Sequence, residues 1–114
     1  MIYLASPYSH PDPFVREQRY LMAAKALSEL LAAECWAYSP IVHCHELAKI
    51  VDLPTHSAFW RRYDFHMLSL STELLVLMLE GWKTSEGVRE EIAEAARLNI
   101  TVTALQPEWL RPPL

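Results

Sequence analysis

Two carboxylates in this chain stand at positions where helical periodicity predicts apolar side chains. Asp64 lies on the same face of a predicted helix as Trp60 and Met67, and Glu91 lies on the same face of another as Val88. An ionised carboxylate is costly to bury, so such a residue is usually paired, hydrogen-bonded or turned toward a cleft. Two of them in one small chain predict a site that uses carboxyl chemistry.

Each carboxylate also has a purely structural interpretation. Glu91 could extend to solvent beside Arg97 or Lys83, and Asp64 could form an ion pair with one of the arginines at 61–62. The sequence leaves both interpretations open beside the functional one.

The composition excludes several classes of protein. Of the 114 residues, 52% are hydrophobic and 21% are charged, and the formal net charge is −4. An acidic chain of this kind indicates no nucleic-acid partner. No uncharged apolar run reaches the roughly 18 residues that indicate a membrane span. The apolar surface left over in so small a chain favours a homodimer or a higher homo-oligomer.

The cysteines and histidines offer little evidence for a metal. Cys35 and Cys44 match no CxxC spacing, so we expect reduced thiols. The run His-Cys-His-Glu at 43–46, with a further ligand at His56 or His66, would suit a metal-dependent hydrolase, but its spacing matches no HExxH pattern. We therefore expect no metal and no cofactor. A strand-like N-terminal segment leaves no room for a signal peptide, so we expect a cytoplasmic protein.

Periodicity predicts alternating strands and helices in one domain, residues 1–114. The expected strands are Met1–Ala5, Cys35–Ser39, Glu73–Leu79 and Ile100–Leu105. The expected helices are Phe14–Glu34, Val42–Val51, Ser57–Leu70 and a fourth that runs from its N-cap Ser85 to Leu98. Asn99 is expected to close the fourth helix, and a tail is expected from Pro107. This order predicts a three-layer α/β/α sandwich with a four- or five-stranded parallel sheet, Rossmann-like or flavodoxin-like. Ligands of such folds bind beyond the carboxyl ends of the strands, where three of the predicted loops meet.

A longer pattern surrounds Glu91. The segment Leu75–Trp82, followed by Ser85–Ala95, carries EGW-x-x-S-x-G-V-x-x-E, and the chain opens with Ile2–His10, IYLASPYSH. Together with Asp64, these segments resemble the nucleoside 2-deoxyribosyltransferase superfamily, and within it a small bacterial and phage branch. The family carries a glycine four residues before an inward-facing glutamate, and the resemblance covers most of the chain.

The resemblance implies an N-glycosidic-bond enzyme, a hydrolase or a deoxyribosyltransferase, that acts on nucleosides or nucleoside 5′-monophosphates. Glu91 would attack C1′ of the sugar and displace the base. Asp64 would protonate or hydrogen-bond the base, or tune Glu91 by like charge, and Tyr3 or Tyr8 would orient Glu91. The transferases have a C-terminal extension that this chain does not match, which favours hydrolysis.

Substrate contacts are expected from the residues near the strand ends. They are Tyr3, Ser6, Ser9, His10, Arg19, His43, His45, Gly81, Trp82, Ser85 and Gly87. The prolines of the first loop supply no N–H donors, so a phosphate would depend on the serines and on Arg16 or Arg19. Alternatively, the crevice binds a nucleotide-like ligand without turnover, as a sensor module. The sequence leaves the base, the sugar and the need for a 5′-phosphate open.

Overall fold

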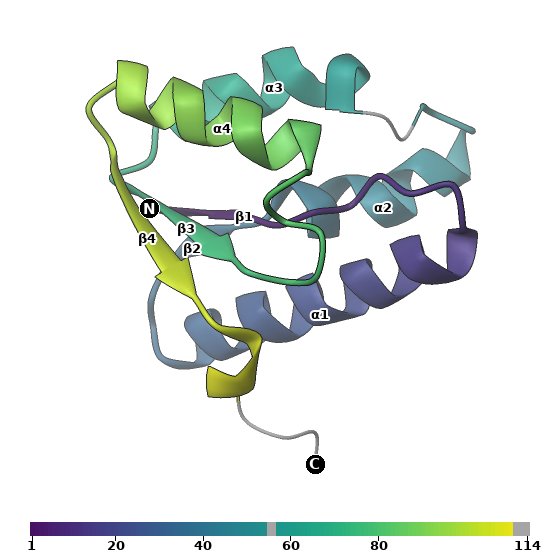
Figure 1. The fold of residues 1–114 in the computed structure, drawn as a ribbon, viewed down its shortest axis with the longest axis horizontal. Helices are drawn as coiled ribbons and strands as arrows, with labels where there is room; N and C mark the ends of the chain where they lie inside the picture. The colour runs from purple at the N-terminus through teal and green to yellow at the C-terminus, as the bar shows by residue number, and fades with distance from the viewer. Residues whose placement is uncertain (55–56, 111–114) are drawn as a thin grey trace.

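The fold is a four-stranded parallel sheet with helices on both faces, seen in a computed structural model of the protein (Figure 1). The structure describes residues 1–54 and 57–110. In chain order, its elements are β1 (Ile2–Ala5), α1 (Pro13–Ala32), β2 (Ala37–Tyr38), α2 (Pro40–Ile50), α3 (Ser57–Ser69), β3 (Glu73–Leu77), α4 (Glu86–Arg97), β4 (Thr101–Leu105) and the 3₁₀ helix η1 (Pro107–Trp109). The predicted α/β fold with a parallel sheet is confirmed.

The strand order β2-β1-β3-β4 determines where a ligand site can form. β1 pairs in parallel with β2 on one side and β3 on the other, with Tyr3 opposite both Tyr38 and Leu74. The chain first crosses from β1 to β2 and later passes back across β1 to reach β3. The connections after β1 and β3 therefore diverge at their carboxyl ends, which is the topological switch point where open α/β sheets bind ligands.

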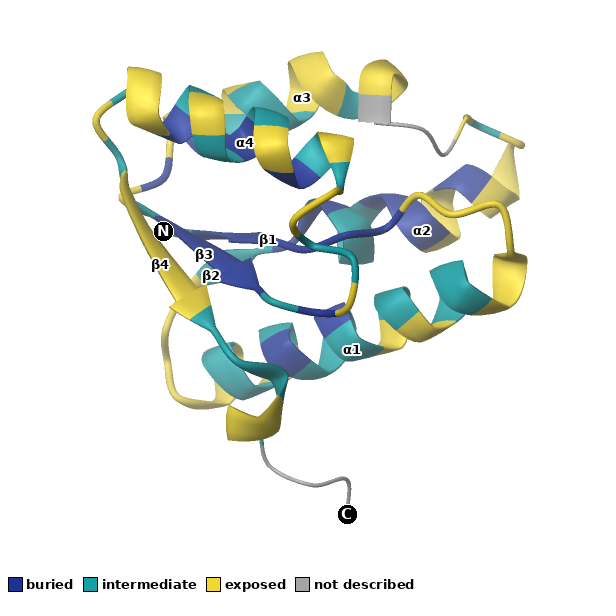
Figure 2. Ribbon diagram, viewed as in Figure 1, coloured by how far each residue is buried: buried dark blue, intermediate teal, exposed yellow. Residues whose placement is uncertain are grey.

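Different helices cover the two faces of the sheet (Figure 1). On one face, Leu4 and Leu75 pack with Ala26 of α1, and on the other face Leu74 packs with Val88 of α4. Because successive residues of a strand point to opposite faces, the continuous apolar run of β3 supplies both cores. Burial is highest in β1 and β3 and low along β4, at the edge of the sheet (Figure 2).

Side-chain caps explain where the helices begin and end. Asp12, Ser39 and Ser85 are the N-caps of α1, α2 and α4, and each accepts a hydrogen bond from a first-turn N–H, at 2.9, 3.1 and 3.3 Å. Asn99 follows α4 with a φ of 57°, and its N–H donates to the carbonyl of Ala96. Asparagine is among the few residues that adopt this left-handed conformation readily. The predicted caps at Ser85 and Asn99 are confirmed.

Some boundaries differ from the predicted ones. β2 is only Ala37–Tyr38, because α1 ends at a left-handed Glu34, φ 61°, and the Cys35 N–H donates back to the carbonyl of Leu30. Cys35 is thus part of the helix end and not of the strand. α2 begins at Pro40, two residues earlier than predicted, since proline fits the first position of a helix.

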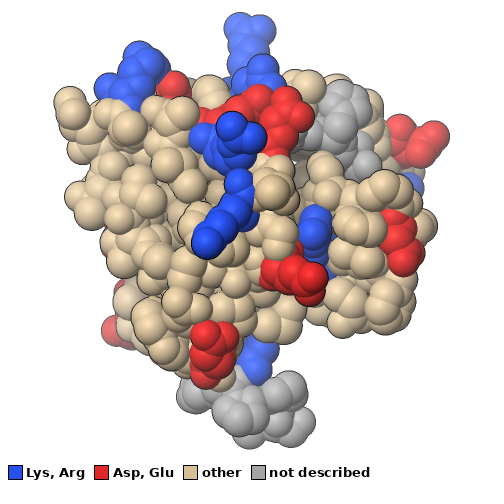
Figure 3. Space-filling model, viewed as in Figure 1, with Lys and Arg blue, Asp and Glu red and all other residues tan. Residues whose placement is uncertain are grey.

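The C-terminal segment is more ordered than the predicted tail. After β4 the chain turns through η1, and Leu110 packs against the core cluster on the α1 side of the sheet. Both cysteines are unpaired. None of the described helices is long and apolar enough to cross a membrane. On the face seen in Figure 3, blue and red side chains lie in small interleaved groups and no extended basic surface is present.

Candidate functional site

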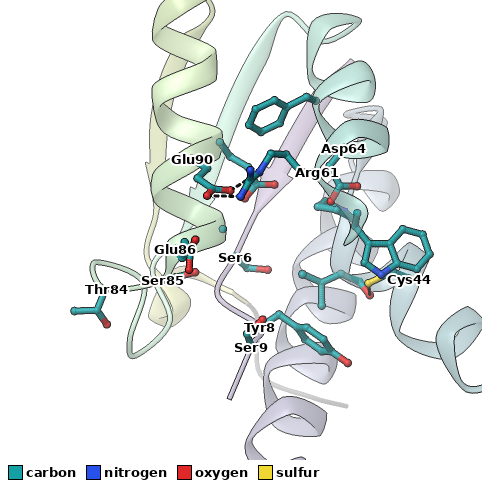
Figure 4. A pocket seen from close by; sticks show the side chains of 16 residues that line it. Ser6, Tyr8, Ser9, Cys44, Arg61, Asp64, Thr84, Ser85, Glu86 and Glu90 are labelled. Atoms are coloured by element: carbon teal, nitrogen blue, oxygen red, sulfur yellow. Dashed lines mark hydrogen bonds and ion pairs between the residues drawn. The ribbon is translucent and has the colours of Figure 1, made fainter. Parts of the chain in front are cut away.

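A cavity of about 290 Å³ opens at the switch point between β1 and β3 (Figure 4). The loop after β1, the facing sides of α2 and α3, and the beginning of α4 contribute to its wall. The lining residues are Ser6, Tyr8, Ser9, Pro40, Ile41, Cys44, Trp60, Arg61, Asp64, Phe65, Thr84, Ser85, Glu86, Gly87, Glu90 and Glu91.

Glu91 lies in this wall on the buried side of α4. Val88 and Ala95 of the same helical face have no exposed surface, and only 8% of Glu91 is exposed. The predicted periodicity of α4 is therefore the reason why a carboxylate is held against the sheet. Arg97, which could have drawn Glu91 to solvent, forms an ion pair with Glu94 instead, at 2.6 Å.

The Tyr3 hydroxyl, from β1, donates a hydrogen bond to Oε2 of Glu91. Burial raises the pKa of Glu91 to about 8; the Tyr3 hydrogen bond opposes this shift, and the negative charge of Asp64 adds to it. Tyr3 itself is buried, and burial followed by the charge of Glu91 raises its pKa well above the usual value. It therefore remains a neutral donor that holds Glu91 in place.

Asp64 faces the same cavity from α3 (Figure 4). Burial raises its pKa to about 7, and the nearby Tyr38 hydroxyl opposes this shift. The Tyr38 oxygen nevertheless has no hydrogen-bond partner among the described residues. Tyr38 is therefore a polar neighbour of Asp64 and not its hydrogen-bond donor.

The arginine proposed as a partner for Asp64 has another partner. Arg61 donates to both carboxylate oxygens of Glu90, with its Nε at 2.9 Å and its Nη2 at 2.6 Å (Figure 4). No ion pair joins Asp64 to Arg61 or Arg62 in the described part of the chain. Glu90 lines the cavity and is joined to α3 by this bridge.

Four predicted substrate-binding residues lie in the wall beside these carboxylates. Ser6 and Ser9 come from the loop after β1, and Ser85 and Gly87 come from the start of α4. Ser6 is 4% exposed, and its hydroxyl has no hydrogen-bond partner among the described residues. A buried hydroxyl without a partner is costly, so a polar ligand group in the cavity would improve its situation.

Tyr8 lines the cavity, but its hydroxyl is already engaged. It lies 2.6 Å from Nδ1 of His45, whose Nε2 lies 3.0 Å from a carboxylate oxygen of Glu17. A carboxylate can only accept, so neutral His45 carries its proton on Nε2 and accepts from Tyr8. Tyr20 stacks on the His45 ring at a centroid distance of 4.2 Å. His45 thus stands behind Tyr8 and does not line the cavity.

Arg19 and Gly81 connect the two loops that frame the cavity, and neither lines it. The guanidinium of Arg19 donates to the carbonyls of Ser9, at 2.9 Å, and Glu80, at 3.3 Å. Gly81 has a φ of 91°, and a Cβ there would lie 2.7 Å from Nη2 of Arg19. The glycine therefore permits both the turn and the close approach of Arg19.

The other predicted contacts also lie outside the lining. The His10 Nδ1 accepts from the Asp12 N–H in an exposed turn. His43 stacks on Tyr63 at 5.3 Å between ring centroids, and Trp82 packs against the core on the α4 side of the sheet. For these residues, and for Arg19 and His45, a direct ligand contact would require a ligand that extends beyond the cavity.

Among the described residues, only two of the run at 43–46 lie in a group that could bind a metal, and they are joined there by Glu17. His45, Glu17 and Glu46 have potential ligand atoms within 4.8 Å of one another, whereas His43 lies in an aromatic cluster. The Lys49 ammonium already lies 3.5 Å from Glu17 and 3.4 Å from Glu46, in the position of a cation. His56 lies outside the described residues, and His66 is exposed on α3.

Sequence reasoning missed several residues of the wall. Arg61, Glu86 and Thr84 carry polar groups into it, and Trp60 and Phe65 supply apolar surface. Trp60 precedes Asp64 by four residues on one helical face, which was the available signal, whereas Phe65 is adjacent to Asp64 in the sequence and gave none. Arg61 and Glu86 gave none, because charged residues near a helix start are usually solvated.

The chain matches the sequence family described as a domain of unknown function (DUF1937) over residues 1–106. It therefore belongs to the DUF1937 family. No curated protein matches the chain.

Proposed function

We propose that this DUF1937 protein is an N-glycosidic-bond enzyme, a hydrolase or a deoxyribosyltransferase, that acts on nucleosides or nucleoside 5′-monophosphates through Glu91. The observation that carries the proposal is a pair of carboxyls, the buried Glu91 and the partly buried Asp64, that face one cavity from different helices. Their pKa values are raised to about 8 and about 7, so both can gain and lose protons near neutral pH. The resemblance to the nucleoside 2-deoxyribosyltransferase superfamily supports the same assignment.

The chemistry follows from the roles that two facing carboxyls can take. The reactive form of the pair carries one proton, on Asp64; because Glu91 has the higher pKa, this is the less populated of the two singly protonated forms. In this form the ionised carboxylate of Glu91 attacks C1′ as the bond between C1′ and the base nitrogen breaks, and Asp64 gives its proton to the leaving base. A glycosyl ester on Glu91 results. Water then attacks C1′, loses a proton to Asp64 and releases the sugar and the Glu91 carboxylate; in transfer, a second base replaces water.

Tyr3 would act as a positioning residue in this reaction. Its hydroxyl donates to one carboxylate oxygen of Glu91, which leaves the other oxygen for C1′. The hydrogen bond also favours the ionised form of Glu91, against the effect of burial.

The test is the release of free base from a panel of ribonucleosides and deoxyribonucleosides and their 5′-monophosphates, followed by chromatography. The native protein should release base from at least one of them, and Glu91→Gln should reduce the rate by about 10³-fold or more. Glu94→Gln, one turn from Glu91 and paired with Arg97 outside the cavity wall, is the matched control and should retain the rate. No release by folded native protein would reject the enzyme.

A ligand-binding module without turnover is the second candidate. It is favoured by the raised pKa of Glu91, because a carboxyl that keeps its proton at neutral pH donates a hydrogen bond instead of attacking. Binding of a panel member by native protein that releases no base would support it.

We also propose a homo-oligomer, in a cytoplasmic setting. Trp36, Ile50 and Trp109 expose 64%, 74% and 66% of their surfaces, and association with a second copy could remove apolar surface of this kind from water. Light scattering that gives the mass of a single chain at micromolar concentration would reject the oligomer.

A further inference from the structure

The charge of the cavity wall bears on which substrates can enter it. Among the lining residues, Asp64, Glu86, Glu90 and Glu91 carry carboxyl groups, and Arg61 carries a guanidinium. Glu90 already binds that guanidinium through two hydrogen bonds. A dianionic phosphate in this cavity would therefore meet a wall whose one cation is paired and whose remaining ionisable groups are acidic.

The other arginines near the cavity are also engaged. Arg16 donates to the carbonyl of His10, and Arg19 donates to the carbonyls of Ser9 and Glu80. Neither arginine lines the cavity. Arg19 thus lies outside the wall, where it holds the loops after β1 and β3 together.

The start of α4 is the place where an anion would otherwise be favoured. Backbone N–H groups and the helix dipole attract negative charge there. In this helix, however, the Val88 N–H already donates a hydrogen bond to the Ser85 hydroxyl oxygen, and Glu86 places a carboxylate in the first turn (Figure 4). Glu86 thus supplies the negative charge that a phosphate would bring.

Ser6 offers a neutral alternative. Its buried hydroxyl has no partner among the described residues and lines the same cavity as Ser85 and Glu86. A hydroxyl can both donate and accept, so it fits a sugar hydroxyl.

We propose that the cavity selects an unphosphorylated nucleoside and rejects its 5′-monophosphate, and that Glu86 is the residue that sets this choice. The inference rests on the proposed function, since it names the substrate class of the same site. From the sequence, a phosphate would depend on the serines and on Arg16 or Arg19. Ser6, Ser9 and Ser85 do line the cavity, but both arginines lie outside it and donate to backbone carbonyls.

The test compares matched pairs, each nucleoside of the panel with its own 5′-monophosphate, by ligand-observed NMR titration of the native protein at low salt. For the nucleoside that binds best, the monophosphate should bind at least about tenfold more weakly, and added salt should reduce the difference. Glu86→Gln should strengthen monophosphate binding by about fivefold and leave nucleoside binding nearly unchanged. Glu108→Gln, an exposed change on η1, should alter neither.

Binding and base release separate this inference from the proposed function. Preferential nucleoside binding without base release would support the selection and reject the enzyme. Preferential release of base from monophosphates would support the enzyme and overturn the selection. Equal binding of both members of each pair, no binding of either, or a Glu86→Gln protein with unchanged preference would also overturn it.

Discussion

Two clusters of polar side chains lie on opposite sides of the cavity and differ in the hydrogen-bond and ion-pair partners that they have. Between α1 and α2, Tyr8, His45 and Glu17 form a continuous hydrogen-bonded chain that ends at a half-exposed carboxylate beside Lys49. Between α3 and α4, the carboxyls of Asp64 and Glu91 face the cavity with phenols as their polar neighbours and no paired cation among the described residues.

The difference distinguishes a supporting network from a reactive site. Hydrogen bonding to His45 and the charge of Lys49 lower the pKa of Glu17, so folding favours its charged form. Burial raises the pKa values of Glu91 and Asp64, so folding opposes their charged forms. The fold thus favours the neutral forms of these two carboxyl groups at a cost in stability. Such groups are typical of sites that exchange protons with a substrate.

After Glu91→Gln, the largest effect is expected from Asp64→Asn, which removes the acid of the carboxyl pair. Base release should fall by about 10²–10⁴-fold, because the leaving base then departs without a proton donor. In the native protein, kcat/KM should follow a bell-shaped pH profile governed by the apparent pKa values of the pair, about 7 and about 8. The variant should lose one limb of the bell.

Asp52→Asn is a matched control for this change, since Asp52 is exposed at the end of α2 and asparagine accepts its left-handed conformation. A bell-shaped pH profile of kcat/KM that persists unchanged in Asp64→Asn would contradict the role of Asp64 as the acid.

The next effect concerns stability and pH. The folded pKa of Glu91, about 8, lies above its ordinary value of 4.5, so the folded state keeps a proton that the unfolded state has lost. Its contribution to stability is complete below about pH 4.5 and is lost as the pH rises toward 8. Relative to Glu91→Gln, the native protein should lose roughly 2–4 kcal/mol of unfolding free energy across that window. Urea denaturation of both proteins at several pH values measures this loss. The same dependence of unfolding free energy on pH in both proteins would contradict it.

His45→Ala should break the supporting network. The change leaves the Tyr8 hydroxyl without its partner and opens a cavity under Tyr20, so we expect a loss of roughly 2–3 kcal/mol in unfolding free energy. His66→Ala, the same change at an exposed position on α3, serves as the control in the same urea titration. An unchanged midpoint in His45→Ala would show that the network does not support the fold.

The smallest effect is expected from Glu17→Gln, and its pH dependence should have the opposite sign to that of Glu91. The folded pKa of Glu17 is lowered, so its contribution is present above its ordinary pKa of 4.5 and is lost as the pH falls below it. The native protein should therefore lose stability relative to Glu17→Gln only in acid. A difference that grows with rising pH would contradict this assignment of Glu17.

The sequence predicted the fold well because each element carried a local signal. The apolar run of β3, the alternation of strands and helices and the caps at Ser85 and Asn99 all depend on neighbouring residues. β2 was predicted too long because the helix end at Glu34 uses a left-handed residue that is neither glycine nor asparagine.

The candidate site could be predicted less completely, for a physical reason. Asp64 and Glu91 were detectable because each breaks an apolar periodicity. The Arg61–Glu90 bridge depends on how α3 and α4 lie side by side, and the engagement of His45 by Glu17 depends on how α1 and α2 do. Such contacts between residues far apart in the sequence leave no spacing pattern. His43 and His45 were therefore predicted to contact the ligand, and Arg61 was not.

The most direct test of the central claim is to trap the glycosyl ester on Glu91. The native protein would be incubated with 2′-fluoro nucleosides, whose fluorine slows breakdown of the ester by disfavouring positive charge at C1′, and then quenched in acid for mass spectrometry. We predict a covalent adduct with the mass of the fluorinated sugar, mapped to Glu91 and absent from Glu91→Gln. Base release with no adduct, or with an adduct on another residue, would contradict the assignment of Glu91 as the nucleophile.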